Sequence, residues 1–186
     1  MADREDVLIN LEKRLIYLSN EINNETIGKI CFHLAYILQE DEENERSQIG
    51  YVRRPIQFFI NSFGGSLYDM WTLVDMMLNS ATPIYTYCTG YAMSSAFKIF
   101  LAGSRRFMSE HATLLYHQLS SWQGGKYQDL VELREKMDKT QKDIENYVMC
   151  RTNIKKEKLK EIREKKIDWY IYAEEAIDLG IATDII

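Results

Sequence analysis

The stretch CTGYAMSSAFKIFLAG, residues 88–103, changes from a strand pattern to a helix pattern at two adjacent serines. Small residues flank the serines, which lets a helix begin close to a neighbouring backbone. One interpretation is a helix cap, because serine is favoured at helix N-termini. The other is that one hydroxyl is a nucleophile at a strand-to-helix turn. The surrounding sequence must distinguish the two.

Outside this stretch, short apolar and β-branched runs alternate with longer helical patterns. This alternation predicts an α/β fold with a mainly parallel sheet. We predict strands at residues 14–19, 55–62, 83–90 and 113–118. We predict helices at residues 25–39, 67–78, 94–101, 127–151, 155–164 and 173–179.

The run QEDEENERSQIGYVRR, residues 39–54, is strongly charged and lacks helical periodicity. Such a run is typical of a solvated loop. We therefore predict that the first helix ends at residue 39 and that a long loop follows it.

The predicted helix at residues 127–151 has about seven turns, which is long for a chain of this size. Its apolar side chains form one stripe on a highly charged surface. The stripe either packs on its own domain or meets another subunit. It consists of Leu130, Leu133, Met137, Thr140, Ile144 and Tyr147.

The composition is that of an ordinary globular protein, with 186 residues of which 46% are hydrophobic. A net charge of -5 disfavours nucleic-acid binding. The three cysteines form no Cys-x-x-Cys pair, which indicates a reducing compartment and no zinc site. The chain has neither a signal peptide nor the ~18 apolar residues of a membrane helix. We predict one cytoplasmic domain over residues 1–186 with no metal, organic cofactor, nucleic-acid partner or membrane partner.

Two further stretches place chemically useful groups at strand ends. In INSFGGSLYD, residues 60–69, paired glycines follow a strand, so their amides could face a ligand or an oxyanion. A purely structural turn is the alternative. His117 ends the strand at residues 113–118, at the edge where parallel sheets place their sites. By contrast, His33 lies on a helix face and His111 in a turn, so neither is a candidate.

Together and in this order, the motifs INSFGGS, GYAMSS and YHQ resemble the ClpP family, the proteolytic subunits of the Clp protease. The C-terminal run DWYIYAEEAIDLGIATDII is also similar to that family. The resemblance covers residues 11–186. It implies a ClpP/crotonase-like fold of stacked ββα units, with the helix at residues 127–151 protruding as a handle.

The resemblance also implies a set of catalytic residues. Ser94 matches the nucleophile rather than Ser95, and His117 matches the general base. Asp168 matches the carboxylate that orients the histidine. The backbone amides of Gly65 and Ser95 match the oxyanion hole. A serine peptidase needs this combination because a serine hydroxyl attacks only when a base accepts its proton.

Family members form two stacked heptameric rings around a chamber, and a Clp ATPase of the AAA+ type feeds unfolded polypeptides into it. The resemblance thus implies a homo-oligomeric serine endopeptidase, with a tetradecamer expected. Residues 120–128 would lie near the strand that contacts substrate and the opposite ring.

The sequence departs from the family pattern at several places. Phe63 replaces a proline before the glycines, and Trp169 replaces an arginine after the aspartate. The segment before residue 11 is short, so the N-terminal pore hairpin is expected to be reduced or absent. These departures bear on the oxyanion turn, on ring contacts and on ATPase docking.

Other functions remain open at this stage. One is an ATPase-independent peptidase of the same fold, of the phage head-maturation or signal-peptide-peptidase type. Another is a non-catalytic ring scaffold, although such subunits typically lack triad residues. A third, acyl-CoA chemistry on the crotonase architecture, is disfavoured by the serine, histidine and aspartate together.

Overall fold

A computed structural model describes residues 7–121 and 124–186, which contain eight strands and six helices. Within this part of the chain no helix is long and apolar enough to cross a membrane. The sheet follows the order β1-β2-β3-β4-β5-β8, and β6 and β7 continue from the far end of β4. The strands are β1 (Val7–Asn10), β2 (Leu15–Leu18), β3 (Ile56–Ser62), β4 (Ile84–Met93), β5 (Arg105–Met108), β6 (Thr113–Tyr116), β7 (Trp169–Ile171) and β8 (Asp184–Ile185).

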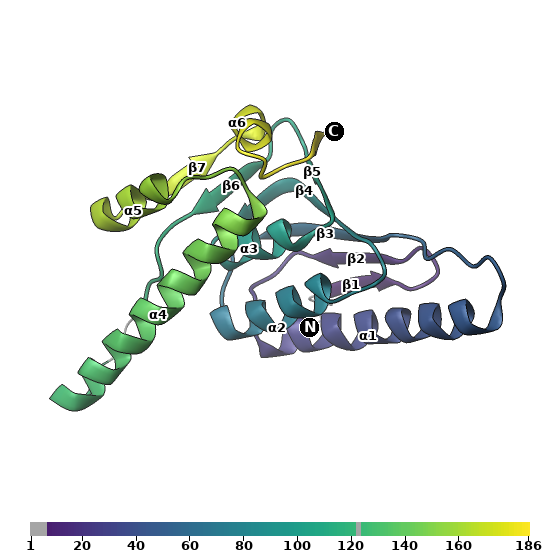
Figure 1. Ribbon diagram of the computed structural model, residues 1–186, viewed down its shortest axis with the longest axis horizontal. Coiled ribbons are helices and arrows are strands. Elements are labelled where there is room, and N and C mark those ends of the chain that lie inside the picture. The colour runs from purple at the N-terminus through teal and green to yellow at the C-terminus, as the bar shows by residue number, and fades with distance from the viewer. Residues whose placement is uncertain (1–6, 122–123) are drawn as a thin grey trace, which may run out of the picture.

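Helices cover one face of this sheet, and the longest ones project beyond it (Figure 1). They are α1 (Asn24–Ser47), α2 (Leu67–Leu78), α3 (Ser95–Ala102), α4 (Tyr127–Arg151), α5 (Lys156–Lys165) and α6 (Ala173–Asp178). Strands β2, β3, β4, β5 and β8 run parallel, as predicted for an α/β fold. β1 pairs with β2 antiparallel, and β7 pairs with β6 antiparallel.

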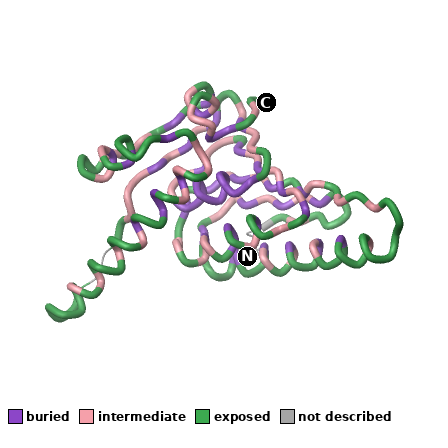
Figure 2. Tube along the Cα trace, viewed as in Figure 1, coloured by how far each residue is buried: buried purple, intermediate pink, exposed green. Residues whose placement is uncertain are grey.

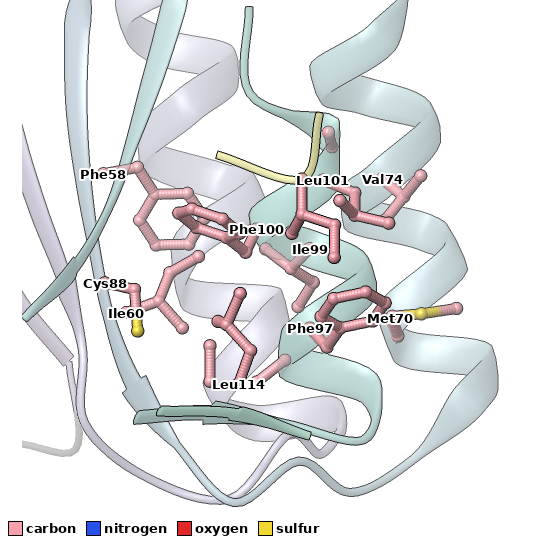
Figure 3. Close-up of a cluster of buried hydrophobic side chains, with 14 of the residues drawn as sticks. Phe58, Ile60, Met70, Val74, Cys88, Phe97, Ile99, Phe100, Leu101 and Leu114 are labelled. Atoms are coloured by element: carbon pink, nitrogen blue, oxygen red, sulfur yellow. The ribbon is translucent and has the colours of Figure 1, made fainter. Parts of the chain in front are cut away.

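The core lies between the sheet and helices α2 and α3 (Figure 3). Alternate residues of β3 and β4 point into it, because successive side chains of a strand face opposite sides. Every residue of α3 is buried, which holds the turn before this helix firmly in place. The labelled members are Phe58, Ile60, Met70, Val74, Cys88, Phe97, Ile99, Phe100, Leu101 and Leu114.

A row of half-buried aromatic rings crosses the sheet on the face opposite the core positions of its strands. Tyr17, Phe59, Tyr87 and Phe107 follow one another across β2, β3, β4 and β5, with successive ring centroids 6.3, 4.5 and 4.7 Å apart. We call these four residues the aromatic row. Half-buried aromatic side chains on an open sheet face are a feature of surfaces that bind another protein.

The prediction of a loop at residues 39–54 is wrong at its start, because α1 continues to Ser47. The cause is Asp41, whose side chain is fully buried and therefore needs partners. Its carboxylate accepts hydrogen bonds from Arg14 at 2.9 and 2.6 Å, from Tyr51 at 2.6 Å and from Thr82 at 2.5 Å. Although burial alone would raise the pKa of Asp41, these hydrogen bonds hold it below its usual value.

The N-terminal half of α4 extends away from the rest of the protomer, as expected for a handle (Figure 2). Its buried residues lie only in the C-terminal half, from Gln141 to Val148. Tyr127 is 82% exposed and Leu130 is 42% exposed. In the segment at 120–128 that we expect near substrate, residues 122–123 lie outside the described residues. The same holds for residues 1–6, on which part of the expected change in the pore hairpin falls.

Candidate active site

Ser94 occupies a strained turn between β4 and α3. Its backbone angles are φ 54° and ψ -119°, a region that is rare outside glycine and costs roughly 1–3 kcal/mol. The Ser94 N–H donates to the carbonyl of Leu115 in β6 at 3.0 Å, which continues the pairing of β4 with β6. The Ser94 side chain makes no capping bond to α3. The helix-cap interpretation therefore does not hold for this hydroxyl.

His117 directly follows β6, so the same strand pairing brings it to Ser94. Its Nε2 lies 2.8 Å from Ser94 Oγ, and its Nδ1 lies 2.5 Å from the carbonyl oxygen of Gln118. A carbonyl oxygen can only accept a hydrogen bond, so Nδ1 carries the proton. Nε2 is then free to accept the hydrogen of the Ser94 hydroxyl. This is the tautomer that a general base requires.

Asp168 directly precedes β7, whose antiparallel pairing sets Trp169 opposite Tyr116. This register places Asp168 in the neighbourhood of His117, close enough for its charge to act on the His117 pKa. In the part of the chain that the structure describes, however, no hydrogen bond joins the two side chains, and Asp168 is exposed. The Gln118 carbonyl occupies the position on Nδ1 that an orienting carboxylate would take.

The paired glycines form the wall of the site facing Ser94. Gly64 and Gly65 have φ angles of +105° and +144°, which side chains rarely adopt. Ile22 donates to the carbonyl of Gly64 at 2.8 Å and accepts from the N–H of Ser66 at 2.6 Å, a bridge that does not use the Gly65 N–H. The Ser95 hydroxyl donates to the carbonyl of Gly65 at 2.9 Å. This bond fixes the two predicted oxyanion residues to each other.

Asn61 joins the glycine turn to the strand that carries the serine. Its Oδ1 accepts from the N–H of Tyr91 at 3.1 Å, at a shift of register between β3 and β4. A Cβ at Gly90 would overlap this amide oxygen, so any side chain there would displace the Asn61 amide. The motifs INSFGGS and GYAMSS are therefore two halves of one local structure.

A pocket of about 230 Å³ opens beside these groups. Ser94, Ser95, His117 and Gly65 line it on one side. The arrangement offers a hydroxyl in contact with an imidazole nitrogen, beside the backbone of Gly65 and Ser95. Acyl transfer needs these groups, because the oxygen of a tetrahedral intermediate must be stabilised while the base holds a proton.

A comparison with protein-family models matches residues 3–186 to the family described as Clp protease. This match spans nearly the whole chain. The chain belongs to the Clp protease family. It is accordingly a protease of the serine type.

Individual members of the Clp protease family are similar to this chain over most of its length. The ATP-dependent Clp protease proteolytic subunit 1 of Shouchella clausii is 27% identical over 178 residues, covering 95% of this chain and 86% of the relative. Subunit 2 of Corynebacterium glutamicum is also 27% identical, covering 95% and 83%. The solved structure of a ClpP1 point mutant from Listeria monocytogenes matches with a TM-score of 0.79 at 21% identity, covering 95% and 92%. This structural match establishes the fold.

Two departures from the Clp protease pattern have local substitutes. The ring of Phe63, which stands in place of the proline, stacks on Tyr91 with centroids 4.3 Å apart. Trp169, which stands in place of the arginine, lies under the ammonium of Lys158 at 4.9 Å. The glycine turn is therefore formed without the proline, and a cation still lies beside position 169.

Lys98 also lines this pocket, and the sequence motifs did not identify it. It lies one turn after Ser94 in α3, is only 4% exposed, and lines the same pocket as Ser94 and His117. The available signal was a lysine that follows Ala96 and Phe97 and precedes the apolar run IFLA in the helix SAFKIFLA. Burial lowers the pKa of Lys98 to about 7.

The pH dependence of serine reactivity tests the environment of His117. Burial first, and then the positive charge of Lys98, lower the pKa of His117, while the Gln118 carbonyl and Asp168 act in the opposite direction. A lowered pKa keeps the imidazole neutral, and hence basic, to lower pH. We expect the acid limb of Ser94 labelling to have its midpoint below pH 6.5. Rates of labelling by a fluorophosphonate between pH 5 and 8 would measure it.

Circular dichroism at each pH provides the control, because it separates protonation of His117 from unfolding. A midpoint above 6.5 in the folded protein would contradict the expectation. It would indicate that Asp168 forms a direct ion pair with His117 during reaction.

Proposed function

We propose that this chain is the proteolytic subunit of a ring-shaped protease that hydrolyses peptide bonds of unfolded polypeptides. In this proposal Ser94 is the nucleophile and His117 the general base, with Asp168 as orienting carboxylate and the amides of Gly65 and Ser95 as oxyanion hole. The observation that carries it is the 2.8 Å contact between Ser94 Oγ and His117 Nε2, with the imidazole proton on the other nitrogen.

The reaction would proceed by acyl transfer. Ser94 Oγ attacks the scissile carbonyl carbon while His117 Nε2 takes the hydroxyl proton. The two amides donate to the oxyanion of the tetrahedral intermediate, and His117 then gives its proton to the leaving amine. Water attacks the resulting ester by the same steps in reverse. The charge of Asp168 favours the imidazolium that forms in each half-reaction.

Assembly into heptameric rings, expected as a tetradecamer, is part of the proposal. The exposed half of α4, with Tyr127 and Leu130, supports contact with a second copy of the chain. The aromatic row supports a further protein contact on the open face of the sheet. The relatives are named as subunits of ATP-dependent Clp proteases, which supports a Clp ATPase of the AAA+ type as the partner in the cytoplasm.

Covalent labelling of the serine tests the proposal. We expect a fluorophosphonate to add once to the wild-type chain and not at all to Ser94→Ala, because the amide donors and the base act on Ser94 alone. Ser95→Ala keeps its backbone amide and loses the hydroxyl bond to Gly65, so it is expected to react more slowly. Intact mass measures the adduct, and native mass measures the assembly separately.

The intact mass and the native mass together distinguish a serine peptidase from a non-catalytic ring scaffold. An adduct in the wild type but equally in Ser94→Ala would contradict the assignment of the nucleophile. A correctly folded ring without any adduct would favour the non-catalytic scaffold instead.

A further inference from the structure

The side chain of Lys98 is buried beside the proposed nucleophile without a counter-ion. Its Nζ lies 5.3 Å from the centre of the Tyr116 ring. Within residues 7–121 and 124–186, its ammonium makes no hydrogen bond and no ion pair. Removing an ammonium from water without a partner is costly, and the lowered pKa of Lys98 reflects that cost.

A carboxylate buried nearby does not fill this role. Glu145 of α4 is 6% exposed, but its Oε1 accepts from Gln141 at 2.9 Å and from Arg163 at 2.7 Å. Its charge is thus matched by the guanidinium of Arg163. Lys98 is left with the face of an aromatic ring, which attracts a cation more weakly than a carboxylate does.

The open side of Lys98 is the pocket next to Ser94. The other side chains around this pocket include the apolar Leu67, Leu119 and Ile144 and the hydroxyls of Ser66 and Ser120. None of the described residues that line it is acidic. The pocket is therefore a small mixed cavity, with apolar side chains, several hydroxyls and one cation, and it suits a short side chain that ends in an anion.

The position of the pocket identifies the part of a substrate that would enter it. A peptide whose carbonyl carbon lies at Ser94 Oγ, with its oxygen at the Gly65 and Ser95 amides, has the side chain of that same residue nearest the pocket. Gly65, Ser94 and Ser95 line both the reaction point and the pocket. The side chain concerned belongs to the residue on the N-terminal side of the cut bond.

We propose that Lys98 makes this pocket selective for glutamate or aspartate on the N-terminal side of the scissile bond. This inference rests on the proposed function, since it assigns specificity to the same site. The substrate carboxylate would supply the missing counter-ion and favour the charged form of the amine. Lys98 is not needed as a base, because His117 already contacts the Ser94 hydroxyl.

Two matched covalent probes can test the selectivity without substrate turnover. Tripeptidyl phosphonate diphenyl esters that carry either glutamate or glutamine at the reacting residue have nearly the same shape and differ in charge. Ser94 Oγ attacks phosphorus, phenoxide leaves, and His117 takes the hydroxyl proton. We expect the second-order labelling rate of the wild type to favour glutamate by roughly 10- to 100-fold, the effect of one hydrogen bond to a charged group.

The Lys98→Met variant removes the charge and keeps a flexible side chain of similar length. It is expected to fold, because it replaces a buried amine by an apolar group. Its glutamate-to-glutamine ratio should fall to about 1 or below, since the carboxylate would then be buried unpaired. Lys160→Met, which changes an exposed lysine of α5, should keep the wild-type ratio.

Each result bears on a specific part of the proposal. The selectivity is overturned, while the proposed function stands, if both probes label the wild type equally. The same holds if a simple fluorophosphonate labels the wild type and neither peptide probe does. A glutamate preference that persists in Lys98→Met overturns the role of Lys98. A wild type that reacts with no phosphorus reagent at all overturns the proposed function, and the selectivity with it.

Discussion

A His117→Ala variant is expected to cleave a fluorogenic peptide roughly 10⁴- to 10⁶-fold more slowly than the wild type. The Ser94 hydroxyl would keep its position at the strained turn, because its backbone bond to Leu115 does not involve the imidazole. It would lose the proposed base, since His117 Nε2 is the imidazole nitrogen that lies 2.8 Å from Ser94 Oγ. The fold should persist, because His117 is only partly buried and lies after β6.

Asp168→Asn is the matched comparison. Because the Nδ1 of His117 donates to the Gln118 carbonyl, the correct tautomer does not depend on Asp168 in this geometry. We therefore expect a smaller loss, at least about tenfold less than for His117→Ala. Single-turnover cleavage of an activated ester would measure both variants. If the two losses are equal, Asp168 must replace the Gln118 carbonyl during reaction.

Two helices that were predicted correctly have capping contacts at their first turn. The helices at residues 67–78 and 127–151 have the bounds of α2 and α4. The first begins after Ser66, whose hydroxyl accepts from the N–H of Asp69. The second begins after Lys126, whose backbone N–H donates to the carboxylate of Asp129. Capping depends on neighbouring residues only, so it can be read from sequence.

Elements that depend on distant partners were missed. The second half of α1 is stabilised by Asp41, which lies 27 residues from Arg14 and 41 residues from Thr82 in the chain. Strand β5 has the sequence RRFM and β8 has only two residues, so neither shows an apolar run. They exist because neighbouring strands pair with them. Tertiary pairing of this kind leaves no periodic pattern in one sequence.

For the site, the motifs placed Ser94, His117 and the glycine turn in one neighbourhood but could not orient the side chains. Which acceptor the His117 Nδ1 uses depends on the backbone at Gln118, and no motif encodes that choice. Lys98 was overlooked for a related reason. A lysine in a helix usually points to solvent, and only the complete burial of α3 turns this one toward the pocket.

Gly65→Ala is expected to lower peptide cleavage by at least about 10²-fold, the usual cost of losing one oxyanion donor. The φ angle of +144° is strained for any residue with a side chain. In addition, a Cβ would lie 2.9 Å from the Ile22 nitrogen and closer still to its carbonyl oxygen, both of which are backbone atoms that cannot rotate away. The turn must move, and with it the Gly65 amide that we propose as an oxyanion donor.

The same change should reduce the free energy of unfolding by roughly 1–3 kcal/mol from backbone strain. Gly28→Ala is the matched control, because nothing lies within 4 Å of a Cβ at that position of α1 and alanine favours a helix. Urea unfolding would show whether Gly65→Ala remains folded, and the fluorophosphonate rate would report the oxyanion hole in the folded fraction. A folded Gly65→Ala protein that reacts at the wild-type rate would show that the Gly65 amide is not a donor. The oxyanion would then depend on Ser95 and on a group from outside the glycine turn.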